Sequence, residues 1–187
     1  RPEIVRGTSI GALVGGIYAA GKLPELEAWV GSLTRRDVIS LVDLTTVGGG
    51  MIGGRKLPEL YREHIGGPRI EDLPVRFAAV ATDLETGAEV WLRQGPLHEA
   101  IRASISIPGI FTPVPRDGRW LVDGALVNPV PVSVCRALGA EVVIAVDLYI
   151  GAKIRSPAPI DELARAGALR VGEGGVGAEA GAGPRVV

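Results

Sequence analysis

The sequence predicts an α/β protein in which a largely parallel central sheet lies between two layers of helices. Two observations lead to this prediction. Strand-like apolar segments alternate with helical segments along the chain, and the segments 75–82 and 141–146 are apolar on both faces, which is typical of strands in a buried sheet. We expect one three-layer α/β/α domain over residues 1–170, incomplete at its N-terminal end.

The predicted elements follow in chain order. A short buried strand around Ile4 and Val5 enters a sharp turn and then a buried helix that ends near Gly21. Turn signals, apolar periodicity and helix-ending glycines delimit the later elements. They are helices over 26–33, 57–64, 97–104 and 132–138, strands over 75–82, 89–92 and 141–146, and a hairpin that turns at Asp117-Gly118.

The last residues differ from this core in composition. Half of residues 172–183 are glycine, and such a segment buries too little apolar area to offset its loss of conformational entropy on ordering. We therefore expect a flexible Gly/Ala-rich tail over 171–187.

Composition limits the partners and the location of the protein. The formal net charge is -1, and the absence of a basic block or stripe gives no reason to expect a nucleic-acid partner. Cys135 is the single cysteine, which favours a reducing compartment, so we expect a cytoplasmic protein. No apolar run reaches the roughly 18 residues that span a bilayer, so any membrane contact is expected to be peripheral. The oligomeric state is left open.

A candidate nucleophile lies near the start of the chain. Gly7, Ser9 and Gly11 match G-x-S-x-G, in which a serine occupies a strained, tight turn from strand to helix with its hydroxyl projecting. We expect both glycines to be required because neighbouring chain crowds them. The N-terminus of the following helix favours a developing oxyanion, and the backbone N–H of Ile10 is the expected donor. The alternative is a glycine-rich turn with a capping Ser or Thr.

The general base is a carboxylate in this interpretation. A Ser-His-Asp triad needs a histidine, but His64 and His98 both lie at ends of predicted helices without a local motif, which favours a surface role. Asp123 is a better candidate, because it ends an apolar strand and Gly124 leaves room for close backbone approach. The alternative for Asp123-Gly124 is a simple turn, which is our interpretation of Asp117-Gly118.

Four segments, taken together and in this order, resemble the patatin-like phospholipase family, which includes bacterial stand-alone members and the catalytic domain of neuropathy target esterase. The resemblance covers roughly residues 4 to 148. Its segments are GTSIGALVGGIYAAG (7–21), ATDLETG (81–87), AIRASISIPGIFTPV (100–114) and LVDGALVNPVPV (121–132). It implies a three-layer α/β/α fold and hydrolysis of lipid acyl esters by a Ser-Asp dyad, without histidine, metal or cofactor.

The resemblance also assigns roles to residues. Ser9 matches the nucleophile and Asp123 the base, in a D-G-[GA] motif that Gly124 and Ala125 complete, while Asp83 matches a structural position at a turn. The implied partner is a lipid or another fatty-acyl ester, cleaved through an acyl-serine intermediate. Partial burial of the aspartate would raise its basicity.

The sequence departs from the family in one respect. The family's glycine-rich oxyanion motif lies upstream of the nucleophile, whereas this chain begins at Arg1 with no such motif. We expect a fragment that lacks this loop and the strand that supports it. Because losing an oxyanion donor costs on the order of 10²–10³ in rate, we expect the fragment itself to be weakly active or inactive.

Two alternatives belong to other functional classes. Residues 48–53 (GGGMIG) match G-x-G-x-x-G, with Asp72 about 20 residues further on. The segment before them is a poor buried strand, which argues against dinucleotide binding. The other alternative is a non-catalytic binding or regulatory module that keeps the hydrolase fold. The identity of the lipid is not determined by the sequence.

Overall fold

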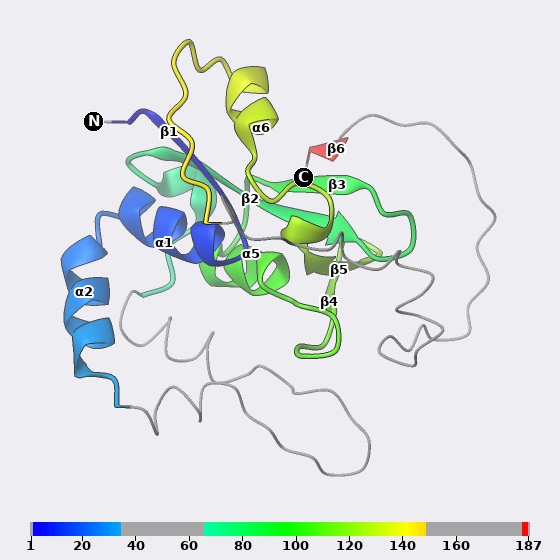
Figure 1. The fold of residues 1–187 in the computed structure, drawn as a ribbon, viewed down its shortest axis with the longest axis horizontal. Coiled ribbons are helices and arrows are strands. Elements are labelled where there is room, and N and C mark those ends of the chain that lie inside the picture. The colour runs from blue at the N-terminus through cyan, green and yellow to red at the C-terminus, as the bar shows by residue number, and fades with distance from the viewer. Residues whose placement is uncertain (1, 35–65, 149–184, 187) are drawn as a thin grey trace.

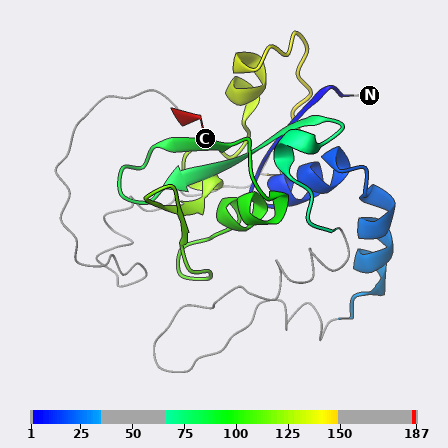
Figure 2. The same cartoon turned by 180° about the vertical axis from the view of Figure 1, so that it is seen from behind.

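The computed structural model describes residues 2–34, 66–148 and 185–186 (Figure 1). In this part of the chain a twisted sheet lies between α1 (Ile10–Ala19) and α5 (Leu97–Ser104) on one face and α6 (Val132–Ala137) on the other, as the view from behind also shows (Figure 2). The predicted α/β/α arrangement is confirmed. The remaining elements are α2 (Leu23–Ser32), the 3-10 turns η1 (Ile70–Asp72) and η2 (Gly124–Leu126), and strands β1 (Ile4–Thr8), β2 (Arg76–Asp83), β3 (Glu89–Leu92), β4 (Val114–Arg116), β5 (Arg119–Asp123) and β6 (Arg185–Val186).

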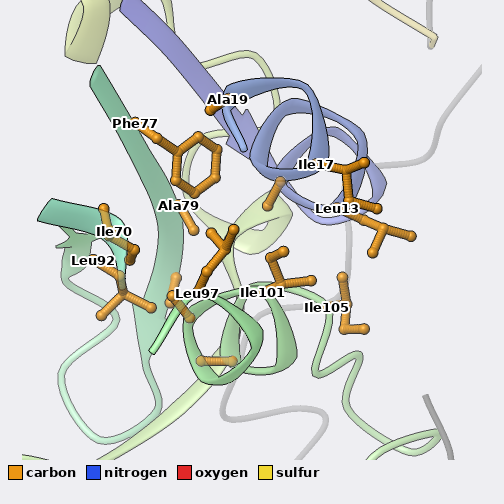
Figure 3. Close-up of a cluster of buried hydrophobic side chains, with 14 of the residues drawn as sticks. Leu13, Ile17, Ala19, Ile70, Phe77, Ala79, Leu92, Leu97, Ile101 and Ile105 are labelled. Carbon is orange, nitrogen blue, oxygen red and sulfur yellow. The ribbon is translucent and has the colours of Figure 1, made fainter. Parts of the chain in front are cut away.

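The larger core lies between the sheet and the α1/α5 layer. Figure 3 shows Phe77 of β2, Ile17 of α1 and Ile101 of α5 converging on this space. Their burial follows from the sequence pattern: α5 carries its apolar residues on one side only, and β2 directs alternate side chains to each face. A smaller cluster on the opposite face joins Val80 and Trp91 to Val134 of α6.

β2 is the central strand of the sheet. It pairs with β1 in parallel along Arg76–Val80, and with β3 and β5 in antiparallel orientation. Among the described strands, the β1–β2 and β3–β6 pairings are parallel and three others are antiparallel, so this part of the sheet is mixed. Short connections explain the β2–β3 and β4–β5 pairs, because a tight turn returns the chain beside the strand that it leaves. β5 instead reaches β2 after β3, α5 and β4.

The turn at Asp117-Gly118 joins β4 to β5, as predicted. Both residues have a positive φ, 50° at Asp117 and 73° at Gly118. Two successive positive φ values are typical of a type I′ hairpin turn, whose twist matches that of the flanking strands. The hairpin places β5, and therefore Asp123 at its end, beside β2.

The predicted strand over 141–146 is wrong in this structure. The segment has no regular secondary structure, and Val142, Ile144 and Val146 are 83%, 90% and 79% exposed. No described strand pairs with it, and an apolar segment is buried as a strand only where it has neighbours on its edges and faces.

Some predictions fall on residues outside the described ranges. These are the helix over 57–64, the glycines at 48–53 and most of the tail, of which only Arg185–Val186 is described, paired with β3. Among the helices that the structure describes, none combines the length and apolarity that crossing a membrane requires.

Candidate active site

The candidate site forms where two strands end on the same edge of β2. β3 occupies one edge of β2 along Ala79–Thr82, so β1 and β5 share the other edge. Thr8, the last residue of β1, pairs with Val80, and Asp123, the last residue of β5, pairs with Ala81. Because their partners are consecutive residues of β2, the C-terminal ends of the two strands meet on this edge.

This arrangement brings Ser9 and Asp123 into contact. The Ser9 hydroxyl donates a hydrogen bond to Oδ2 of Asp123 over 2.6 Å, although the residues are 114 positions apart in the sequence. Asp123 is buried, whereas Ser9 is partly exposed. A buried carboxylate therefore holds a hydroxyl that solvent still reaches.

Ser9 has the backbone geometry of a sharp elbow. Its φ is 54° and its ψ is -125°, a conformation that costs a non-glycine residue on the order of 1–3 kcal/mol. α1 begins at the next residue, and its first turn hydrogen-bonds to the Ser9 carbonyl through the Ala12 N–H, over 2.9 Å. The Ser9 side chain makes no capping hydrogen bond to α1. The structure therefore does not support a capping serine.

The two glycines that flank Ser9 differ in the space that is available for a side chain. A Cβ at Gly7 would lie 2.1 Å from the Gly11 carbonyl oxygen, so Gly7 is required by close backbone approach. A Cβ at Gly11 would have no described atom within 4 Å. The expectation that both positions are crowded is thus confirmed for Gly7 and wrong for Gly11. Gly11 is an exposed residue in the first turn of α1, and it contributes its backbone to the contact.

Gly124 is needed for a similar reason. A Cβ there would lie 2.2 Å from the Val80 carbonyl oxygen and 3.0 Å from the Thr8 side chain. The chain after Asp123 therefore passes directly over the junction of β1 and β2. This close approach fixes the position from which Asp123 reaches Ser9.

The Asp123 carboxylate is held by hydrogen bonds and affected by burial. Burial raises its pKa above the ordinary value, and the hydrogen bonds from Ser9 and from the Ala125 N–H partly oppose that rise. The Ala125 N–H donates to Oδ1 over 2.7 Å. A carboxylate of raised pKa is a stronger base than an ordinary aspartate.

The backbone of Asp123 is anchored by separate groups. Its N–H donates to the Ser106 carbonyl over 2.9 Å, and its carbonyl accepts from the Thr82 hydroxyl over 2.8 Å. Both partners are buried. The carboxylate therefore projects from a fixed backbone on rigid elements of the fold.

Ser104, which we had not predicted as a site residue, supports the nucleophile. Its fully buried hydroxyl donates to the Val80 carbonyl over 2.6 Å and accepts from the backbone N–H of Ser9 over 3.0 Å. α5 is thereby tied both to the strained elbow and to β2. A serine among apolar residues at the end of an amphipathic helix is the sequence signal that could have drawn attention to it.

Three of the four remaining candidate residues lie in the described part of the chain. Ile10 is the first residue of α1 and is exposed, and no described group accepts a hydrogen bond from its N–H. His98 lies on α5, and no hydrogen bond joins it to Ser9 or Asp123 in the described structure. Asp83 accepts hydrogen bonds from the N–H groups of Glu85 and Thr86, which agrees with the predicted turn. His64 lies outside the described residues.

The chain matches known proteins over most of its length. The patatin-like phospholipase family model matches residues 1–151. An uncharacterised NTE family protein of Mycobacterium tuberculosis is 43% identical over 144 residues, which are 77% of this chain and 40% of that protein.

Two animal proteins are similar over the same region. Patatin-like phospholipase domain-containing protein 7 of Rattus norvegicus is 33% identical over 153 residues, and the neuropathy target esterase sws of Drosophila melanogaster is 31% identical over 153 residues. Each match covers 78% of this chain and 11% of the relative, so the chain spans well under half the length of these proteins. By its match to the family model, the chain belongs to the patatin-like phospholipase family.

Proposed function

We propose that this chain carries the reaction centre of a serine hydrolase that cleaves lipid acyl esters, with Ser9 as the nucleophile and Asp123 as the general base. The observation that carries the proposal is the 2.6 Å hydrogen bond from the Ser9 hydroxyl to the Asp123 carboxylate. Family membership supports the reaction class, and the names of the relatives point to lipid esters.

The first half of the proposed reaction forms an acyl-serine. Asp123 takes the proton from the Ser9 hydroxyl while the serine oxygen attacks the ester carbonyl carbon. The tetrahedral intermediate collapses by breaking the bond to the alcohol oxygen, which leaves with the proton from Asp123. The acyl group remains on Ser9.

The second half releases the fatty acid. Water gives a proton to Asp123 and attacks the acyl carbonyl, and the Ser9 oxygen leaves as it regains the proton. The same carboxylate acts twice, so the raised pKa of Asp123 serves both proton transfers.

The N-terminus of α1 is suited to the charge that develops on the carbonyl oxygen. The Ile10 N–H directly follows the nucleophile and is open to a ligand among the described residues. The positive end of the helix dipole adds to its effect. We assign Ile10 one oxyanion contact through its backbone.

The acyl chain requires an apolar surface beside Ser9. Ile10 and Val14, one turn apart on the same helix, are 51% and 44% exposed. Ile107 and Ile110, which follow α5, are exposed as well. We propose that these side chains contact the acyl chain of the substrate.

Replacing the nucleophile tests the proposal. Ser9→Ala should abolish covalent labelling by a fluorophosphonate probe together with release of fatty acid from phospholipid, lysophospholipid and neutral ester substrates. Ser32→Ala is the matched control, because Ser32 is exposed and, within the described part of the chain, its hydroxyl donates only to the Trp29 carbonyl of its own helix. Labelling that persists in Ser9→Ala would refute the assignment. An unsubstituted protein that is neither labelled nor able to hydrolyse any of these esters would favour the non-catalytic module.

A further inference from the structure

Three arginines gather on neighbouring strands away from the Ser9–Asp123 pair. Arg6 lies on β1, Arg76 on β2, and Arg93 directly after β3. All three line one cavity of about 530 Å³. The catalytic proposal gives none of them a role.

Strand register places the three side chains on one face of the sheet. Arg6 pairs with Ala78, two residues after Arg76, so both arginines face the same side. Arg93 comes two residues after Trp91, which pairs with Val80 of the same side. This is the face that α6 covers. The convergence of positive charge therefore follows from the pairing of β1, β2 and β3.

No carboxylate of the described chain neutralises these arginines. None of the three forms an ion pair there. Glu71 is the one acidic residue in the cavity lining, and its carboxylate is engaged by Arg69 over 2.8 Å and by the Gly95 N–H over 2.8 Å. The cavity therefore keeps an excess of positive charge.

Arg6 is held in an unfavourable environment for a cation. Its Nη1 donates to the Val5 carbonyl over 2.8 Å, but its buried Nε has no hydrogen-bond partner among the described residues. Burial is the main cause that lowers its pKa to about 10; the nearby Cys135 thiol opposes this, and Arg93 and Arg76 lower the pKa further. An anion in the cavity would relieve the repulsion among the three guanidinium groups.

We propose that Arg6, Arg76 and Arg93 form a binding site for a phosphate group. Guanidinium groups bind phosphate oxygens through paired, charge-assisted hydrogen bonds. Two of them on strands and a third directly after a strand supply more donors than one carboxylate would need, which favours the phosphate dianion. Free phosphate and the headgroup of an anionic phospholipid share this chemistry.

This site is separate from the hydrolytic centre. Arg6 precedes Ser9 by three residues along β1, a spacing of roughly 10 Å in an extended strand. Arg76 lies at the start of β2, whereas Asp123 pairs near its end. The inference therefore does not depend on acyl transfer.

Phosphate binding by the purified chain tests the inference. The probe is inorganic phosphate, titrated at constant ionic strength against chloride, with the thermal unfolding midpoint and calorimetric heat as readouts. Saturable binding is expected. Arg76→Gln and Arg93→Gln should each weaken it about tenfold, as expected for the loss of a charge-assisted pair. Neither arginine has an ion pair in the described structure, so both variants are expected to fold.

Arg136→Gln is the matched control. It removes the same charge from α6, but its guanidinium donates to the Ala140 carbonyl and does not line the cavity. It should bind phosphate as the parent does. A loss as large as that in Arg93→Gln would indicate a general effect of net charge and overturn the site.

A second experiment separates the two sources of phosphate. Co-sedimentation compares phosphatidylcholine vesicles with vesicles that also contain phosphatidic acid. Binding of phosphatidic acid vesicles that depends on Arg76 and Arg93 assigns the site to a lipid headgroup, and arginine-dependent binding of phosphate alone assigns it to a free phosphate. Absence of both, or binding that survives both substitutions, would refute the inference.

Discussion

Two apolar segments that were both predicted to be buried strands differ in burial and in strand pairing. The strand β2 (RFAAVATD) is buried along almost all its length and is paired on both edges, while the segment 141–146 (EVVIAV) is mostly exposed and pairs with no described strand. The exposed segment has four β-branched residues and β2 has two, although β-branched residues favour strands. Composition therefore indicates that a segment can form a strand, but the strand forms only where the edge of a neighbouring strand is available for pairing.

The candidate site depends on β2. β1 and β5 end at consecutive residues of β2, and Ser104 and Gly124 both contact the backbone of Val80. No side chain of 141–146 takes part in the hydrogen bonds that position Ser9, Ser104 and Asp123 in the described structure. Substitutions should therefore have large effects on stability and labelling around β2, and small effects on both in 141–148.

The largest difference is expected for a charge placed in each segment. Val80→Asp should cost about 4 kcal/mol or more of unfolding free energy, because it buries an unpaired carboxylate where the valine is fully enclosed. Ile144→Asp should change it by no more than about 0.5 kcal/mol. Urea unfolding followed by circular dichroism measures both. Similar losses in the two variants would mean that 141–148 is buried in solution.

The next largest effect concerns the glycines of the elbow. Gly7→Ala should cost about 3 kcal/mol or more and abolish fluorophosphonate labelling of the parent, because the new Cβ would overlap backbone. Gly11→Ala should instead stabilise the chain by about 0.5–1 kcal/mol, since alanine favours a helix more than glycine does. Unfolding and labelling measured on both variants check this. An equal loss in Gly11→Ala would show that this position is crowded after all.

A smaller effect is expected at the buried end of α5. Ser104→Ala should lower stability by about 1–3 kcal/mol, because it leaves the Val80 carbonyl without its hydroxyl partner and also removes the acceptor for the Ser9 N–H. The labelling rate should fall about tenfold for the same reason.

Ser106→Ala is the control for this change. Ser106 is equally buried, but its hydroxyl donates to the Arg102 carbonyl and accepts from the Arg102 guanidinium. The Ser106 carbonyl that anchors Asp123 is kept in this variant. Labelling should stay at the parent rate. Equal loss of labelling in both variants would remove the special role given to Ser104.

The smallest effect on stability should be the pH dependence introduced by Asp123. Because burial raises its folded pKa above the unfolded value, its contribution is full below the unfolded pKa and is lost as pH rises through the folded pKa. Asp123→Asn, which cannot ionise, should therefore gain stability relative to the parent as pH rises from 3 towards 7. Hydrolysis by the parent should fall as pH drops through the same raised pKa. Urea midpoints and pH–rate profiles measure these trends, and a relative gain towards low pH would contradict them.

Local sequence predicted much of the fold. The helix over 97–104, the strand over 89–92 and the hairpin at Asp117-Gly118 have the expected bounds or turn, because periodicity and turn residues act over a few positions. The pairing partners were harder to predict. The antiparallel places of β3 and β5 beside β2, and the exposure of 141–146, depend on contacts between distant parts of the chain.

The sequence predicted the site only where a residue type is tied to a particular backbone geometry. A serine between glycines and an aspartate before a glycine indicated close backbone approaches, and the structure has them at Gly7 and Gly124. Ser104 gave a weaker signal, because its importance comes from two hydrogen bonds to distant backbone. The crowding expected at Gly11 came from the pattern rather than from its place on an exposed helical turn.

Pairing with β2 fixes the relative positions of the two reacting groups. Thr8, which directly precedes Ser9, and Asp123 pair with residues one step of about 3.3 Å apart on β2, whatever the length of the polypeptide that connects them. Insertions in the intervening loops can therefore accumulate without moving either partner. A slip of one residue in β1 or β5 would instead turn a partner to the opposite side of the sheet. Length variation should thus concentrate in the loops and spare the alignment of these three strands.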